Sequence, residues 1–168
     1  MPMESTFDTT RSEFIEKTGL ISQAEGLPRI AGRVFGMLIF DGDMVSFGDL
    51  TTRLQVSRAS ISTSIRILEE RGLVKRMTKP GERQDFFHLA PNPYATMLEG
   101  IKRRTMSTCD DIAETIQKLP SDCDAVERLN AYAHFYASTD KALGVALREL
   151  NTTGPAHQAR DQKDETHD

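Results

Sequence analysis

Apolar residues near the start of the chain recur at helical spacing. Phe7, Phe14 and Ile21 stand seven residues apart, and this period predicts a helix from residue 9 to about residue 25. The Gly-Leu-Pro sequence at residues 26–28 predicts the end of that helix, because glycine and proline are typical of helix ends.

A second run of apolar positions at helical spacing predicts a helix from Pro28 to about Phe40. Pro28 suits the first turn, where its missing N–H costs no hydrogen bond. Gly32 and Gly36 are four residues apart and share one face. That face therefore permits the close approach of another backbone.

Two capping signals predict the next two helices. Ser46 and Asp49 fit a capping box that opens a short helix, and residues 45–47 are either a very short strand or the start of that helix. After a tight connection, Ser57 caps a further helix, which is expected to end at Gly72.

Beyond Gly72 the pattern changes to that of strands. Residues 73–78 and 84–89 predict two strands, with residues 79–83 as the tip of a hairpin. Two long helices follow, one capped by Asn92 and one from Ser121 to about Leu150. The remaining residues are polar and lack apolar periodicity, which predicts disorder.

This order of elements is that of a winged helix-turn-helix. The predicted fold class is mainly α with a small β-hairpin wing, and with N- and C-terminal dimerisation helices on either side. The predicted domains are an N-terminal dimerisation helix at residues 1–27, a DNA-binding winged helix at 28–91, two long dimerisation helices at 92–150 and a disordered tail at 151–168.

The helix capped by Ser57 has two chemically different sides. Ile61, Ile65 and Leu68 share one side, which predicts a core seam. The other side is small, polar and cationic, so it suits entry into the DNA major groove and bonding to base edges or phosphates. The residues expected to contact DNA from this helix are Ser57, Arg58, Ala59, Ser60, Ser62, Thr63 and Arg66.

The predicted hairpin concentrates positive charge. Lys75, Arg76, Lys79 and Arg83 lie on it, and Arg83 follows the tip, where a guanidinium can enter an adjacent minor groove. The alternative is that these charges only face solvent on the surface of a strand. The hairpin comes directly after a capped helix rich in Ser, Thr and Arg, and this position favours DNA contact instead.

The distribution of charge changes the meaning of the net charge of −4. Residues 28–90 hold 10 basic and 7 acidic side chains, whereas residues 1–27 hold 2 and 5, and residues 91–168 hold 9 and 13. A basic segment between acidic flanks indicates that one surface of the protein meets an anion.

Composition excludes several classes of protein. A chain of 168 residues buries a core without disulfides, no apolar run approaches the ~20 residues that span a bilayer, and no signal peptide is readable. We therefore expect a cytoplasmic protein with no membrane partner. Nucleotide-binding, zinc-protease and serine-hydrolase motifs are missing from the sequence. We expect no enzyme activity, no cofactor and no metal, since the four histidines lack metal-ligand spacing.

The two cysteines, Cys109 and Cys123, lie on different predicted helices. We expect small, buried side chains on apolar faces, with a redox switch as the alternative.

The last helix carries an apolar seam that predicts a homodimer. Two long amphipathic helices outside a compact winged helix have little core of their own to cover, which favours packing between subunits over packing within one chain. The first helix is expected to join this interface. The expected dimerisation residues are Phe14, Ile21, Val126, Leu129, Tyr136, Leu143, Leu147 and Leu150.

The segment from Pro28 to Pro91 resembles the MarR-type winged-helix repressors, and among them the GbsR-like branch. The resemblance rests on the stretches SRASISTSIRILEERGLV and PGER. The wing of MarR-like proteins carries an acidic-x-Arg pattern, whereas here Glu82 is followed directly by Arg83. The resemblance implies a DNA-binding homodimer, usually a repressor controlled by a small molecule. The GbsR-like branch implies control of choline or glycine betaine uptake and synthesis.

A quaternary ammonium effector such as choline is recognised by aromatic rings, with a carboxylate nearby. The candidate effector residues are Phe35, Tyr132, Phe135, Tyr136 and Asp140. The alternative is that these rings only pack in the core and the interface.

These patterns predict a ligand-responsive, sequence-specific transcriptional regulator whose partners are a double-stranded DNA operator, a second copy of itself and a small-molecule effector. Two recognition helices would read half-sites about 34 Å apart, one turn of DNA. The alternatives are a winged-helix protein-interaction module without DNA binding, and an enzyme on a helical scaffold. The cationic helix and wing favour the first reading over the second, and the missing catalytic motifs count against the third.

Overall fold

A computed structural model of the protein describes residues 2–152, with side chains from residue 6 onward. It divides into two compact units, one up to Pro93 and one from Tyr94 on. The tail expected to be disordered lies outside the described residues except for residues 151 and 152, which are helical.

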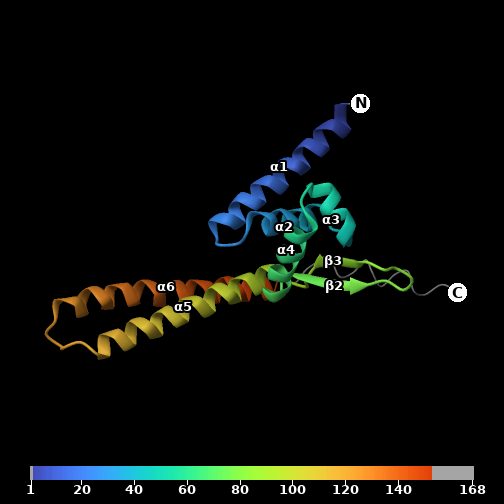
Figure 1. The fold of residues 1–168 in the computed structure, drawn as a ribbon. Helices are drawn as coiled ribbons and strands as arrows, with labels where there is room; N and C mark the ends of the chain where they lie inside the picture. The colour runs from blue at the N-terminus through green and yellow to red at the C-terminus, as the bar shows by residue number, and fades with distance from the viewer. Residues whose placement is uncertain (1, 153–168) are drawn as a thin grey trace. The chain divides into compact units, whose positions relative to one another are not determined.

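The elements confirm the predicted mainly helical fold with a small β wing (Figure 1). The first unit contains α1 (Pro2–Ala24), α2 (Arg29–Asp41), β1 (Val45–Ser46), α3 (Phe47–Leu54), α4 (Arg58–Glu70), β2 (Val74–Thr78) and β3 (Asp85–Leu89), and the second is built from α5 (Pro93–Gln117) and α6 (Asp124–Thr152).

The strands form one antiparallel sheet in the order β1-β3-β2. Phe87 of β3 pairs with Val45 on one side and with Arg76 on the other. Of the two alternatives for residues 45–47, both occur in part, because Val45 and Ser46 form β1 and Phe47 begins α3. The third strand adds hydrogen bonds that a two-stranded hairpin lacks, and it joins the wing to the start of α3.

The core of the first unit lies where α2, α4 and the sheet meet. Ile61, Ile65 and Leu68 of α4 are fully buried, as are Leu38 of α2 and Phe87 of β3. The core seam predicted for α4 is therefore confirmed. Burial of that seam turns the opposite side of α4 outward.

The N-caps predicted for α3 and α4 are both present. The Ser46 Oγ accepts a hydrogen bond from the Asp49 N–H at 3.1 Å, and the Ser57 Oγ accepts one from the Ser60 N–H at 3.2 Å. The α4 helix ends at Glu70 with Arg71 as its C-cap, and Gly72 follows with φ of 68°, the left-handed conformation that glycine adopts freely. The ends of the two helices are thus determined by local chemistry.

The glycine face of α2 packs against α1. A Cβ placed on Gly32 would lie 2.5 Å from the Ser22 Cβ, and one placed on Gly36 would lie 2.8 Å from the Thr18 Cβ. The close approach predicted from the glycine spacing is confirmed, and α1 is the helix that makes it. The α1 residues facing α2 are correspondingly small, whereas Ile21 remains 59% exposed.

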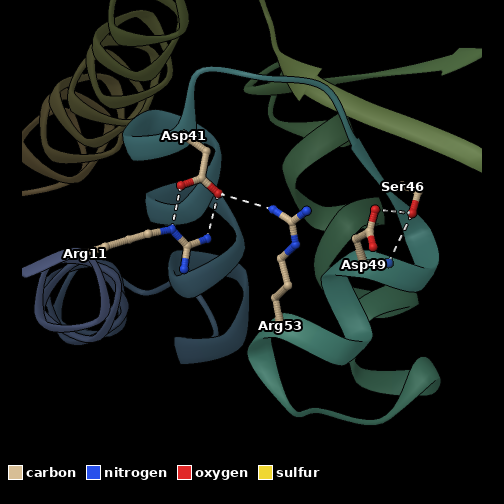
Figure 2. Close-up of polar contacts among 5 residues, drawn as sticks. All are labelled: Arg11, Asp41, Ser46, Asp49 and Arg53. Carbon is tan, nitrogen blue, oxygen red and sulfur yellow. Dashed lines mark hydrogen bonds and ion pairs between the residues drawn. The ribbon is translucent and has the colours of Figure 1, made fainter. Parts of the chain in front are cut away.

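Asp41, at the end of α2, ties three helices together (Figure 2). The Arg11 Nε and Nη2 of α1 each donate a hydrogen bond of 2.6 Å to its carboxylate. The Arg53 Nη1 of α3 lies 3.8 Å from the same group. This pairing holds the N-terminal half of α1 to the end of α2.

In the second unit, α5 and α6 run antiparallel and side by side (Figure 1). Lys102 of α5 forms an ion pair with Asp140 of α6. The α6 helix begins three residues later than predicted, because the Cys123 N–H bonds the Pro120 carbonyl and closes a turn first. None of the residues of α6 is fully buried. The apolar seam of α6 is therefore only partly covered by its own chain.

Candidate nucleic-acid interface

The outward side of α4 has the composition predicted for a DNA-reading helix. Ile61, Ile65 and Leu68 turn inward, and Ser64 is buried beside them. The residues expected to contact DNA turn outward: Ser57, Arg58, Ala59, Ser62, Thr63 and Arg66 are exposed, and Ser60, whose N–H bonds the Ser57 cap, is half-buried.

A short turn sets the angle between α3 and α4. Gln55 adopts a left-handed conformation with φ of 53°, and its N–H bonds the Thr51 carbonyl at the end of α3. The Arg33 Nη2 of α2 donates a hydrogen bond of 3.0 Å to the Leu54 carbonyl. These contacts fix α3 behind α4 in the arrangement of a helix-turn-helix.

The wing carries three exposed cations that are available to an anion. Lys75, Lys79 and Arg83 are exposed, and within residues 6–152 none of them forms an ion pair. The Lys79 Nζ lies 4.3 Å above the centre of the Phe86 ring, which leaves its charge accessible. Gly81 forms the tip with φ of 83°.

Arg76 is held differently from the other wing cations. Its Nε and Nη2 donate hydrogen bonds of 3.0 Å to the Glu69 carboxylate of α4, and its Nη1 donates one of 3.0 Å to Asp85 of β3. The hydrogen bonds to Glu69 are the main reason that the pKa of Arg76 is raised. The guanidinium is thus engaged within the protein, where it joins the wing to the end of α4.

The sequence pattern did not single out three residues that shape this surface. The Phe47 ring lies under the Arg58 guanidinium, with 4.7 Å from Cζ to the ring centre. Arg53 adds a half-exposed cation in the last turn of α3. The Gln84 Oε1 accepts a weak hydrogen bond of 3.4 Å from the Gly48 N–H. The only available signal was an aromatic residue immediately after the Ser46 cap.

The expected dimerisation residues lie in both units. Those in α6 are all half-buried: Val126, Leu129, Tyr136, Leu143, Leu147 and Leu150. In α1, Phe14 is half-buried with its ring 5.6 Å from that of Phe40, and Ile21 is exposed. Each unit therefore retains apolar surface for a partner to cover.

The candidate effector residues are only partly brought together. The rings of Tyr132 and Tyr136 are 5.0 Å apart with their hydroxyls at 3.2 Å, and the rings of Phe135 and Tyr136 are 5.2 Å apart. The hydrogen bond to Tyr132 raises the pKa of Tyr136. Phe35 belongs to the buried core of the first unit, at 5% exposure, and Asp140 is paired with Lys102. Neither unit by itself assembles the full set.

Other chemistry was sought in the described part of the chain. Cys109 on α5 and Cys123 just before α6 are both free thiols, and both are half-buried rather than buried. Residues 2–152 contain no cluster of three His, Cys, Asp or Glu side chains that could hold a metal ion. Of the described helices, none combines the length and the apolarity needed to cross a membrane.

Comparison with known proteins agrees with this geometry. Residues 25–84 match the model of the MarR family. The HTH-type transcriptional regulator MmpR5 of Mycobacterium tuberculosis (strain ATCC 25618 / H37Rv) is 35% identical over 103 residues, which are 61% of this chain and 62% of that protein. The match thus spans less than two thirds of the relative. The crystal structure of a transcriptional regulator superposes with a TM-score of 0.70 at 27% identity, covering 85% of this chain and 99% of that one.

Proposed function

We propose that the protein is a sequence-specific DNA-binding transcriptional regulator, because residues 25–84 match the model of the MarR family and the first unit folds as a winged helix. Its partner is double-stranded DNA. The α4 helix enters the major groove with its N-terminal residues at the base edges, and the wing carries Arg83 towards the adjacent minor groove.

The observation that carries this proposal is a set of exposed cations left without a carboxylate partner among the described residues. They lie on two elements that a winged helix presents to DNA: Arg58 and Arg66 on α4, and Lys75, Lys79 and Arg83 on the wing. Exposed cations without an internal partner neutralise phosphates and release counterions, which favours DNA binding.

The test is a fluorescence-anisotropy titration at two salt concentrations. The probes are the duplex upstream of the protein's own gene and a scrambled duplex of the same composition. We expect tighter binding to the first probe, with log affinity falling linearly as log salt rises. Binding to neither duplex would contradict the proposal and favour the alternative, a winged-helix module that binds another protein.

Three arginine variants separate DNA contact from folding. Arg66→Ala and Arg83→Ala are expected to weaken operator binding without loss of stability, and each phosphate contact removed lowers the salt slope by about 1. Arg76→Ala is expected to lower the midpoint of urea unfolding instead, because Arg76 is bonded to Glu69 and Asp85. Equal DNA affinity for wild type and a variant would remove that arginine from the interface.

The second part of the proposal is a homodimer that acts as a repressor. The 29 residues of α6 form a long helix with no fully buried side chain, and Tyr132, Phe135 and Val145 on it are 46–60% exposed. A second copy would cover this surface and pair two recognition helices about 34 Å apart. Binding of the dimer over a promoter would block polymerase. The protein acts in this way in the cytoplasm and without enzyme activity.

The third part is control by a small molecule, with the GbsR-like branch and osmoprotectant genes as the specific form. The support is the ring cluster of Tyr132, Phe135 and Tyr136, whose faces can meet a quaternary ammonium group. We expect choline or glycine betaine to raise the melting temperature and to change operator affinity. If neither ligand alters either quantity, this part of the proposal is wrong, while the DNA-binding part stands.

A further inference from the structure

A column of alternating cations and rings crosses the winged helix. The Arg58 Cζ lies 4.7 Å from the centre of the Phe47 ring, the Phe47 and Phe87 rings are 6.3 Å apart, and the Arg76 Cζ lies 5.4 Å from the centre of the Phe87 ring. We call these four residues the stacked column. It joins the first residue of α4 to the start of α3, to β3 and to β2.

The two arginines of the column use their guanidinium groups in different ways. Arg76 has its N–H edges bonded to Glu69 and Asp85, so only its face is left for Phe87. Arg58 also uses its face, on Phe47, but none of the described residues accepts a hydrogen bond from its edge. Its five N–H donors are therefore available to a ligand.

An arginine that is stacked before DNA arrives loses less conformational entropy on binding. An unrestrained arginine side chain costs free energy when a complex immobilises it. A ring against one face restricts the rotamers while leaving the donor edge open, because stacking and hydrogen bonding use different parts of the guanidinium. Phe47 is only half-buried, whereas Phe87 is 1% exposed and belongs to the core.

We propose that Phe47 is a positioning residue, which holds the Arg58 guanidinium ready to contact DNA. This inference rests on the proposed DNA-binding function and adds a residue that itself carries no charge and no hydrogen-bonding group. The two arginines of the stacked column then have different roles: Arg58 contacts the DNA, and Arg76 holds the wing to α4.

The first test is a double-mutant cycle of Phe47→Leu and Arg58→Ala, with duplexes selected from a random library by the wild-type protein. Phe47→Leu keeps an apolar contact with Phe87 but removes the ring face. We expect it to weaken binding about threefold when Arg58 is present, which is the range of a cation–π contact at an exposed site. In the Arg58→Ala background we expect no further loss. Phe47→Tyr keeps the ring and should bind like wild type.

The matched control is Phe86→Leu, which removes a ring that faces Lys79 instead of Arg58. Its effect on DNA affinity should be the same with and without Arg58. Equal losses for Phe47→Leu in both backgrounds would overturn the inference, because they would show that Phe47 acts only by packing.

The second test needs no DNA. In the free protein, the ring current of Phe47 should shift the Arg58 side-chain proton resonances upfield, and the shift should vanish in Phe47→Leu and persist in Phe47→Tyr. Resonances unaffected by Phe47→Leu would overturn the inference even if the protein binds DNA. Failure of the proposed function is a different result: wild type would then bind no duplex although the upfield shift is present.

Discussion

The close contact between α1 and α2 predicts that one added methyl group on Gly32 destabilises the packing of these two helices. In Gly32→Ala, the new Cβ would lie 2.5 Å from the Ser22 Cβ, 2.6 Å from the Ser22 Oγ and 2.9 Å from the Gly19 Cα. Two of these atoms belong to a buried side chain and the third is backbone, so none is the far end of a flexible group. The two helices must therefore move apart.

The magnitude follows from two opposing terms. Overpacking a well-packed interior costs about 1–3 kcal/mol, and three contacts below 3.0 Å place this site at the upper end. Replacing glycine by alanine within a helix stabilises the helix by about 1 kcal/mol, because alanine has the higher helix propensity. We therefore expect the free energy of opening the α1–α2 pair to fall by about 2 kcal/mol.

Gly100→Ala is the matched control, since it makes the same change within a helix where space is open. Its Cβ would meet only the Nη1 of Arg104, at 3.6 Å, and the Nη2 of Arg103, at 3.9 Å, both the ends of flexible side chains. Without overpacking only the helix-propensity gain remains, so this variant should stabilise α5 by about 0.5–1 kcal/mol.

Hydrogen exchange measured by mass spectrometry reports the two units separately. Peptides from α1 and α2 should exchange about 30-fold faster in Gly32→Ala, which is about 2 kcal/mol at 1.4 kcal/mol per factor of ten. Peptides from α5 should exchange more slowly in Gly100→Ala. If Gly32→Ala exchanges as slowly as wild type, the α1–α2 contact is looser than the distances imply and the reasoning fails.

Three further predictions follow from the same structure. Leu143→Glu should sediment as a monomer and Ser138→Glu, an exposed site on another side of α6, as a dimer; a dimer for Leu143→Glu would remove the α6 seam from the interface. Asp41→Asn should lower the free energy of unfolding by about 1–2 kcal/mol, because it weakens two charge-assisted hydrogen bonds from α1. The control is Glu13→Gln, which loses only an exposed ion pair and should unfold at the same urea concentration as wild type. Equal urea midpoints for wild type, Asp41→Asn and Glu13→Gln would argue against the role of Asp41. Ser57→Ala should cost about 1 kcal/mol through the lost N-cap and Ser57→Asp should restore it, so a stable Ser57→Ala would mean that the cap contributes little.

Much of the candidate interface was predictable because it depends on short-range rules. The caps at Ser46 and Ser57 follow from hydrogen bonds between residues three apart. The inward side of α4 follows from apolar residues at helical spacing, and its polar side is then exposed by exclusion. These features need no knowledge of what lies across the fold.

Contacts between distant residues were not predictable in this way. Nothing in the hairpin sequence distinguishes Arg76 from Lys75 or Arg83 as a cation, yet two carboxylates from different elements engage only Arg76. Likewise, Phe47 lies eleven residues before Arg58 but on a different helix, with the turn at Gln55 between them, so helical spacing does not predict their contact. The helix-turn-helix angle alone brings the ring under the guanidinium.

By itself, the sequence determined the kind of elements, their ends and the side of α4 that turns outward, because periodicity and capping act over three or four residues. The tertiary structure decided that α1 covers the glycines of α2, that Phe35 lies in the core rather than beside Tyr136, and which arginines remain available to DNA. Such contacts join residues that are remote along the chain, so only the packing of whole helices and strands against one another specifies them.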